Sequence, residues 1–91
     1  MNHILLLEDD ATLGQGIRFA LENSEARVTL CSALSQARSL LSGQAYDLLI
    51  LDVNLPDGSG LDLLREVRRS GLRVPVILLT ANDMETDIVM G

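Results

Sequence analysis

Short, almost wholly apolar runs alternate with amphipathic stretches along this chain. Apolar runs occupy residues 4–7, 48–51 and 76–79, and a run with β-branched residues occupies 27–31. These runs are too short for helices, and the apolar ones contain no polar position that would face solvent. They are therefore predicted to be strands buried on both faces, as in a parallel sheet.

Apolar residues at helical spacing fill the intervals between these runs. The helical stretches lie at residues 13–21, 34–41 and 61–67. Ser59 and Asp62 form a capping-box-like pair before the third stretch. A fourth helix is predicted to open at Asn82 or Asp83 and to be incomplete at Gly91. The strict alternation of strand and helix predicts an α/β fold with a doubly wound parallel sheet and right-handed crossovers.

The composition is typical of one globular domain, covering residues 1–91. Apolar residues make up 47% of the chain, which is too short for a second domain. No apolar run approaches the length of about 18 residues that a membrane span needs. The start of the chain lacks a basic segment followed by a cleavage site. No membrane partner is therefore expected, and the predicted location is cytoplasmic.

Charge and cysteine content exclude several functions. The formal charge is −6, from 13 acidic and 7 basic residues, and every basic residue is arginine. An acidic domain repels nucleic-acid phosphates, so the chain is not expected to bind DNA by itself. Cys31 is the only cysteine, so a disulfide or a thiolate metal cluster is excluded, and a buried free thiol is expected.

Acidic residues close two of the predicted strands. Glu8 and Asp9 follow the first apolar run, and Asp52 follows the run at 48–51. In a parallel sheet the carboxyl ends of neighbouring strands share one edge, where ligands collect. Three carboxylates brought together there repel by about 1–4 kcal/mol per pair at about 4 Å. A divalent cation would remove that repulsion. Asp10 is expected to cap the following helix instead of joining the set.

These residue types suit magnesium-assisted phosphoryl chemistry. Mg²⁺ prefers oxygen ligands, so two or three carboxylates and a backbone carbonyl just past Asp52 would hold it. A bound cation also neutralises the oxygens of an incoming phosphoryl group, which lets a carboxylate attack it as a nucleophile. Thr80 ends the run at 76–79, and its hydroxyl would be able to donate to a phosphoryl oxygen. The competing interpretation is that all these acids merely cap helices and solvate strand ends.

Three pieces of the sequence resemble the receiver domain of two-component response regulators. They are Ile4-Leu-Leu-Leu-Glu-Asp-Asp10, Asp47-Leu-Leu-Ile-Leu-Asp-Val-Asn-Leu-Pro-Asp-Gly-Ser-Gly60 and Val74-Pro-Val-Ile-Leu-Leu-Thr-Ala81. They occur in the family's order and spacing and cover nearly the whole chain. The segment from Asp52 to Leu64 is most similar to the OmpR/PhoB-like subfamily, whose output is a winged-helix DNA-binding domain.

The resemblance implies a flavodoxin-like strand order, 2-1-3-4-5, and a set of roles. Asp52 would accept phosphate from a sensor histidine kinase, and Mg²⁺ would be held by Glu8, Asp9, Asp52 and the backbone carbonyl of Asn54. Phosphorylation would then switch the activity of a DNA-binding transcription regulator.

Further residues receive roles from the same resemblance. Thr80 and Ala81 would contact the phosphoryl group, with Thr80 as the switch hydroxyl. The side chains of Asn54 and Asn82 would tune how fast water removes the phosphoryl group.

The chain departs from the family in one respect. A complete receiver has a fifth βα unit whose strand ends in a lysine that pairs with the phosphoryl group, and this chain has no lysine. The expectation is a receiver truncated before its fifth strand, with strand order 2-1-3-4 and impaired phosphotransfer. The run at 76–79 would then be an open apolar edge, and the stripe at 13–21 would be partly exposed. A homodimer or an exchanged oligomer is therefore expected.

Two other functions are compatible with an acidic strand end. A Mg²⁺-dependent phosphohydrolase also uses an aspartate nucleophile, but it usually carries a general acid two residues later, where this chain has Asn54. A receiver-like interaction module that never takes phosphate would need a broken acidic site. Glu8, Asp9, Asp52 and Thr80 are all present, so the phosphoacceptor function is favoured and turnover by an enzyme is not expected.

Overall fold

A computed structural model describes residues 2–79 and 86–89. The helices are α1 (Ala11–Leu21), α2 (Leu34–Gly43) and α3 (Gly60–Arg69). The strands are β1 (Asn2–Leu7), β2 (Ala26–Cys31), β3 (Leu48–Asp52), β4 (Asn54–Leu55), β5 (Gly58–Ser59), β6 (Val76–Leu79) and β7 (Thr86–Val89). No helix in this described part of the chain has both the length and the apolar character needed to cross a bilayer.

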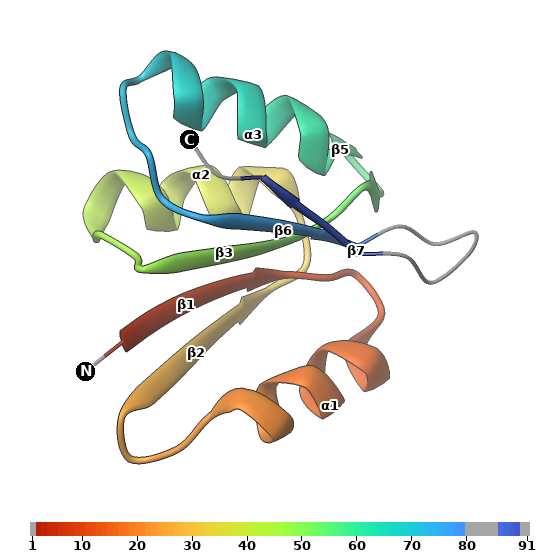
Figure 1. Ribbon diagram of the computed structural model, residues 1–91. Helices are drawn as coiled ribbons and strands as arrows, with labels where there is room; N and C mark the ends of the chain where they lie inside the picture. Colours follow the sequence, from red (N-terminus) through yellow and green to blue (C-terminus); the bar gives the residue numbers. More distant parts are fainter. Residues whose placement is uncertain (1, 80–85, 90–91) are drawn as a thin grey trace.

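A five-stranded sheet with the order β2-β1-β3-β6-β7 forms the centre of the molecule. β1, β2, β3 and β6 are parallel, and β7 runs antiparallel to β6. Helices α2 and α3 cover one face of the sheet and α1 lies on the other (Figure 1). The predicted doubly wound α/β fold is confirmed, because β6 is the fourth parallel strand and the order of the parallel strands is 2-1-3-4.

Side chains of the parallel strands alternate between two apolar cores. On the α2–α3 face, Leu5, Leu7, Leu49 and Leu51 are fully buried. On the α1 face a smaller cluster forms around Leu6. Both faces of β1 and β3 are thus buried, as their uninterrupted apolar sequences predicted.

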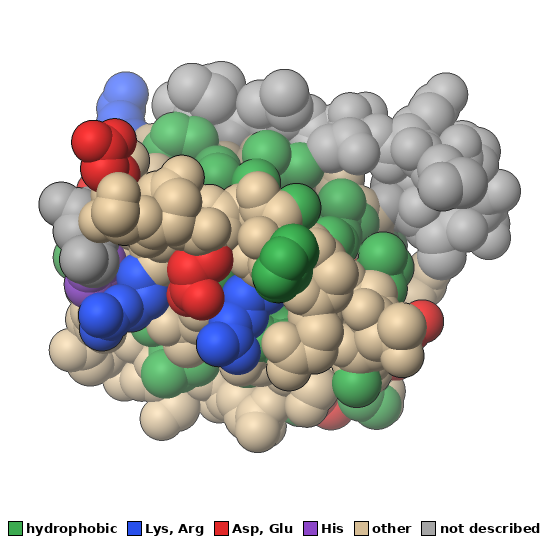
Figure 2. Space-filling view, turned by 90° about the horizontal axis from the view of Figure 1, so that it is seen from below, with side chains coloured by type: hydrophobic (Ala, Val, Ile, Leu, Met, Phe, Trp, Pro, Cys, Tyr) green, Lys and Arg blue, Asp and Glu red, His purple; other side chains and the backbone are tan. Residues whose placement is uncertain are grey.

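The α1 face is less completely covered than the α2–α3 face. α1 carries three exposed large hydrophobic side chains, Leu13, Phe19 and Leu21. Viewed from the α1 side, hydrophobic side chains are visible across this surface of the molecule (Figure 2). The predicted exposure of the apolar stripe at 13–21 is confirmed for Leu13 and Leu21, while Ile17 packs against the smaller core.

Two predictions about the C-terminal part were wrong. Residues 86–89 form strand β7, where the sequence had predicted a helix opening at Asn82 or Asp83, and β7 pairs with β6 along its whole length. Pairing satisfies backbone N–H and C=O groups of β6 that would otherwise lack partners, and Thr86, Ile88 and Val89 are β-branched residues that favour strands. The run at 76–79 is therefore not an open edge, and the described sheet has five strands instead of four.

Helix ends largely follow the expected capping chemistry. Asp10 accepts a hydrogen bond from the backbone N–H of Leu13 at 3.1 Å and caps α1. Ser59 caps α3 by accepting from the N–H of Leu61. Asp62 pairs with Arg65 at 3.2 Å, so the predicted capping box forms only in its Ser59 half.

Candidate functional site

Glu8 and Asp52 are brought together by the pairing of two parallel strands. Leu7 of β1 is in register with Leu51 of β3, so the next residue of each chain segment emerges at the same edge of the sheet. Asp9 follows Glu8 into the loop that leads to α1. Carboxylates on separate sequence runs therefore meet at the carboxyl edge, as the parallel arrangement predicted.

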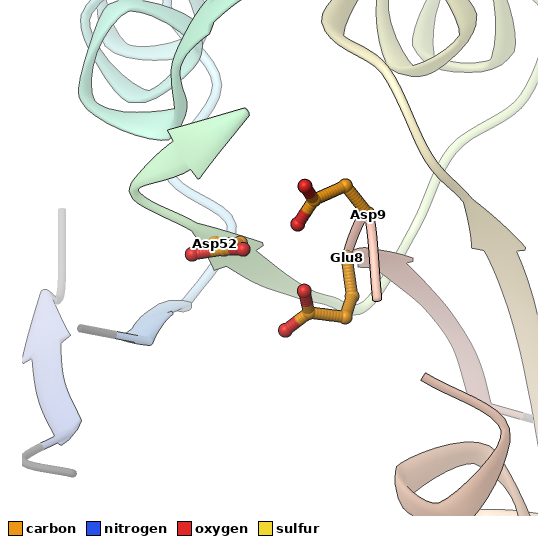
Figure 3. A group of neighbouring side chains, drawn as sticks. All are labelled: Glu8, Asp9 and Asp52. Atoms are coloured by element: carbon orange, nitrogen blue, oxygen red, sulfur yellow. The ribbon is translucent and has the colours of Figure 1, made fainter. Parts of the chain in front are cut away.

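The three acids converge tightly. Each of Glu8, Asp9 and Asp52 offers a carboxylate oxygen, and these oxygens all lie within 4.8 Å of one another. The three side chains extend toward the same space at the strand ends (Figure 3). Glu8 is 4% exposed and Asp52 is 7% exposed, while Asp9 is exposed to solvent. The cluster thus has two buried ligands and one at the opening.

Burial makes this cluster electrostatically unfavourable without a counter-charge. Withdrawal from solvent raises the pKa of the Glu8 carboxyl from 4.5 to about 7. The backbone N–H of Asp10 opposes this rise in the pKa, and the neighbouring Asp52 carboxylate adds to it. Glu8 therefore holds a proton over part of the neutral range, and a cation that replaced this proton would relieve the repulsion from Asp52.

Backbone donors orient the two buried carboxylates. The N–H of Asp10 donates to Glu8 Oε2 at 3.1 Å, and the N–H of Asn54 donates to Asp52 Oδ1 at 3.1 Å. Each bond engages one oxygen of its carboxylate. The second oxygen of Asp52, Oδ2, is not used by the Asn54 bond.

Close packing behind Asp52 fixes the start of the following loop. The N–H of Gly60 donates to the carbonyl of Val53 at 3.2 Å. A Cβ at Gly60 would overlap the backbone carbonyl oxygen of Asp52, so only glycine allows α3 to begin this close to β3. The loop between β3 and α3 is therefore held against the strand that carries Asp52.

The donor set fits a hard divalent cation. Carboxylate oxygens are the ligands that Mg²⁺ prefers, and Mg²⁺ keeps several waters when the protein supplies few ligands. The open side at Asp9 would admit such waters. Cys31 is buried in the larger core as a free thiol, as predicted, and it does not belong to the cluster of carboxylates. Soft-metal chemistry therefore has no support at this site.

The structure locates some predicted site residues and not others. Glu8, Asp9 and Asp52 lie together, Asn54 contacts Asp52 through its backbone N–H, and Asp10 caps a helix as expected. The remaining predicted positions, Thr80, Ala81 and Asn82, lie outside the described residues.

One polar residue of the loop that follows Asp52 was missed by the sequence interpretation. Asp57 accepts hydrogen bonds from the N–H groups of Leu34 and Ser35, at the start of α2. The available signal was indirect: Ala33, which precedes α2, cannot cap a helix, so a cap from elsewhere in the fold was required.

A doubly wound parallel sheet with side chains clustered at its carboxyl edge defines the class of α/β domains that bind ligands at the ends of their strands. The family model described as response regulator receiver domain matches residues 4–91. The chain belongs to the response regulator receiver domain family. The resemblance found in the sequence is thereby confirmed, and the comparisons give no support to the phosphohydrolase alternative.

Individual relatives agree with this assignment. The chain is 47% identical over 88 residues to response regulator protein PmrA of Pseudomonas aeruginosa, covering 97% of this chain and 40% of that protein. It is 41% identical over 88 residues to transcriptional regulatory protein QseB of Escherichia coli O157:H7, with the same coverage of 97% and 40%. The chain thus spans about two fifths of the length of these curated relatives.

The fold also matches solved receiver structures. Response regulator protein TrrA from Thermotoga maritima, described in complex with Mg²⁺–BeF, superposes with a TM-score of 0.83 at 28% sequence identity. The match covers 91% of this chain and 72% of that chain.

Proposed function

We propose that Asp52 is a phosphoacceptor and that the chain relays a signal by accepting a phosphoryl group from a sensor histidine kinase. The observation that carries this proposal is the convergence of Glu8, Asp9 and Asp52 within 4.8 Å. In this role Mg²⁺ would be held by the three carboxylates and by the backbone carbonyl of Asn54. The complex of the neighbour TrrA with Mg²⁺–BeF supports the choice of metal.

The chemical step is a phosphoryl transfer between two side chains. The Oδ2 atom of Asp52 attacks phosphorus, a P–O bond forms, and the P–N bond to the kinase histidine breaks. The electron pair of the broken bond returns to the imidazole, which leaves. Mg²⁺, when bound, supplies charge neutralisation for the phosphoryl oxygens. The Asn54 N–H keeps Oδ1 engaged, which leaves Oδ2 as the attacking atom.

The proposed activity ends at one modified aspartate and is not turnover of a substrate. A phosphohydrolase of this type usually carries a general acid two residues after the nucleophile, and the amide of Asn54 at that position is too weak an acid to protonate a leaving group. The domain is accordingly a signalling module, with at most self-phosphotransfer and loss of its own phosphoryl group. Thr80 and Ala81 are assigned to contact with the phosphoryl group, and Asn82 to tuning its lifetime, by family resemblance alone.

The output is proposed to be control of transcription. The relative QseB is described as a transcriptional regulatory protein, which supports a parent protein of the OmpR/PhoB-like type with a separate DNA-binding domain. The acidic receiver itself would not contact DNA, because its net charge of −6 repels phosphates. The proposed site of action is the cytoplasm, where kinase, Mg²⁺ and DNA are all accessible.

Phosphorylation by a small donor tests the proposal directly. The purified chain is incubated with acetyl phosphate and Mg²⁺, and intact mass spectrometry is expected to show one added phosphoryl group, located on Asp52, on a fraction of the chains. Asp52→Asn and omission of Mg²⁺ are each expected to abolish it, whereas Glu25→Gln, an exposed change outside the site, is a matched control. No modification at any Mg²⁺ concentration, or modification that survives Asp52→Asn, would contradict the proposal. Release of phosphate from phosphomonoesters would support a hydrolase instead.

Self-association is proposed to occur through the α1 face. Leu13 and Phe19 are 49% and 88% exposed, and burying them against a second copy of the chain would remove apolar surface from water. Light scattering over a range of protein concentrations is expected to show growth of a dimer, weakened by Phe19→Ser. A monomer at all concentrations would contradict this part of the proposal.

A further inference from the structure

Helix α2 begins without a cap from its own sequence. Its N-cap residue is Ala33, which makes no side-chain hydrogen bond. The first turn of a helix has free N–H groups that need acceptors. Here Oδ1 of Asp57 accepts from the N–H of Leu34 at 2.9 Å, and Oδ2 of Asp57 accepts from the N–H of Ser35 at 3.2 Å. One carboxylate that lies 22 and 23 residues further along the chain thus caps α2 with both of its oxygens.

Asp57 belongs to the hairpin that directly follows Asp52. β4 and β5 pair antiparallel, with Asn54 opposite Ser59 and Leu55 opposite Gly58, and Asp57 lies in the connection between them. The base of this hairpin contacts the acidic site, because the backbone N–H of Asn54 donates a hydrogen bond to Asp52 Oδ1. The hairpin is therefore attached to Asp52 at its base and to α2 at its tip.

Packing at the tip leaves little freedom for the hairpin. Gly58 has a φ of +147°, and a Cβ at that position would lie 2.6 Å from Cδ1 of Leu34. Leu34 is itself 1% exposed and belongs to the larger core. Leu55 packs against the same core. The backbone of the hairpin thus rests directly on the first residue of α2, next to the two Asp57 hydrogen bonds.

The charge of Asp57 strengthens the tether. The hydrogen bond from the backbone N–H of Leu34 lowers the pKa of the Asp57 carboxyl, and the N–H of Ser35 and the Arg38 guanidinium act in the same direction. The group is ionised at neutral pH, so both contacts are charge-assisted and lie at the positive end of the helix dipole.

We propose that Asp57 is a positioning residue for the acidic site, which it serves by fixing the β4–β5 hairpin to the start of α2. This inference rests on the proposed function of Asp52. Without the tether, only apolar contacts hold the hairpin on α2, and these allow a small shift that moves the Asn54 N–H away from Asp52 Oδ1. The carboxylate of Asp52 and the Asn54 backbone then lose the arrangement that suits a shared cation. Helix α2 and the site are thereby linked through one side chain.

Asp57 could act only as a helix cap or also as a positioning residue. These two roles predict different outcomes when α2 is given another N-cap. Asp57→Ala removes both contacts and destabilises α2. Adding Ala33→Ser gives α2 a cap of its own, because Ala33 has the extended backbone (φ −145°, ψ 154°) that N-cap residues adopt. The double variant therefore has a capped helix but no tether. Ala33→Ser alone is the matched control, and Asp57→Asn keeps one acceptor oxygen.

Amide hydrogen exchange and Mg²⁺ titration, both followed by NMR, test the inference. Asp57→Ala is expected to lose exchange protection at Leu34, Ser35 and Asn54. In the double variant, thermal stability and the exchange protection of the α2 amides are expected to return. The Asn54 amide should still exchange fast, and Mg²⁺ affinity should stay about tenfold below that of the wild type. A tenfold loss is the lower end of the effect of removing a group that supports a metal ligand. Asp57→Asn is expected to lie between the wild type and Asp57→Ala.

Several results would overturn the inference. If Asn54 protection returns in the double variant together with α2, Asp57 is only a helix cap. If Asp57→Ala leaves Asn54 exchange at the wild-type rate, the hairpin does not depend on the tether. A wild-type chain that fails to bind Mg²⁺ would instead contradict the proposed function, and Asn54 exchange would still decide whether Asp57 positions the hairpin.

Discussion

Glu8 and Asp52 lie next to each other at the ends of two paired strands, one residue beyond the Leu7–Leu51 pair. The two carboxylates repel, and both are buried. Backbone pairing and the surrounding leucines hold them together against this repulsion. The site therefore weakens the metal-free fold, and a counter-charge, whether a proton on Glu8 or a bound cation, strengthens it.

Replacement of Asp52 by asparagine is expected to stabilise the metal-free chain. The change removes the charge next to Glu8, and the amide oxygen still accepts from the Asn54 N–H. We expect the free energy of unfolding to rise by about 1 kcal/mol, the lower end of the repulsion between close charges. For a domain of this size, that corresponds to a rise of about 4–8 °C in the midpoint of thermal unfolding.

Calorimetry in EDTA and in Mg²⁺ would measure this effect. Mg²⁺ is expected to stabilise the wild type and to have little effect on Asp52→Asn. Glu25→Gln removes one negative charge at an exposed position and controls for net charge. If Asp52→Asn in EDTA had a lower midpoint of thermal unfolding than the wild type, Asp52 would stabilise the metal-free fold, and its repulsion with Glu8 would not be the dominant effect.

The raised pKa of Glu8 predicts an unusual pH dependence of stability. In the folded chain the pKa of Glu8 is about 7, against an ordinary value of 4.5. Between these values the folded state holds a proton that the unfolded state has lost, so metal-free stability falls as pH rises through this window. The total loss is up to about 3 kcal/mol, at about 1.4 kcal/mol per pH unit.

Urea unfolding at pH 5, 6, 7 and 8 would follow this change. Glu22, Asp57 and Glu66 have lowered pKa values, so they titrate below the window and do not obscure it. Saturating Mg²⁺ is expected to remove the decline, because the cation binds the ionised carboxylates. Glu8→Gln should remove it as well. A wild-type stability that rises from pH 5 to pH 7 in EDTA would contradict the assignment of the raised pKa.

The buried thiol provides an independent measure of local opening. Burial raises the pKa of Cys31 to about 11, and the side chain is 6% exposed. Since the thiolate is the reactive form, alkylation by iodoacetamide at pH 8 is expected to be very slow in the folded chain and fast in urea. Mg²⁺ should slow it further by stabilising the fold. Rapid labelling of the folded chain would show that β2 opens readily.

The sequence predicted the main elements because local pattern and tertiary structure agreed there. The apolar runs ending at Glu8 and Asp52 had no solvent-facing position, so a parallel sheet followed, and with it the meeting of their acids. Asp10 and Ser59 capped helices as their chemistry suggested. In each case the deciding information lay within a few residues.

The failures came from partners distant in sequence. Residues 86–89 became a strand because they pair with the edge of β6, a partner that their own β-branched sequence does not identify. Asp57 has the sequence context of an ordinary turn residue. Its hydrogen-bond partners, Leu34 and Ser35, belong to α2 and are distant in sequence, so the sequence alone did not indicate them. The β4–β5 hairpin is too short to give a periodic signal. Such contacts form only when helices and strands pack against one another in the folded chain.

Two glycines of the chain allow a matched test of the packing behind Asp52. A Cβ at Gly60 would overlap the backbone carbonyl oxygen of Asp52, which cannot move without disturbing β3. Gly60→Ala is therefore expected to lower the free energy of unfolding by about 3 kcal/mol, as in overpacked cores. Gly16 lies exposed within α1, where a Cβ would meet no other atom within 4 Å. Gly16→Ala should raise stability by about 0.5–1 kcal/mol, because alanine favours helix more than glycine does.

Urea unfolding of the two variants, together with Mg²⁺ titration, separates global stability from site geometry. Gly16→Ala should bind Mg²⁺ as the wild type does. Gly60→Ala should bind it more weakly even in conditions where it is fully folded, because the displaced Asp52 backbone carries the carboxylate with it. If Gly60→Ala were as stable as Gly16→Ala, the start of α3 would have to lie further from β3 than the structure shows. If it were destabilised but bound Mg²⁺ normally, the position of the carboxylate would not depend on this contact.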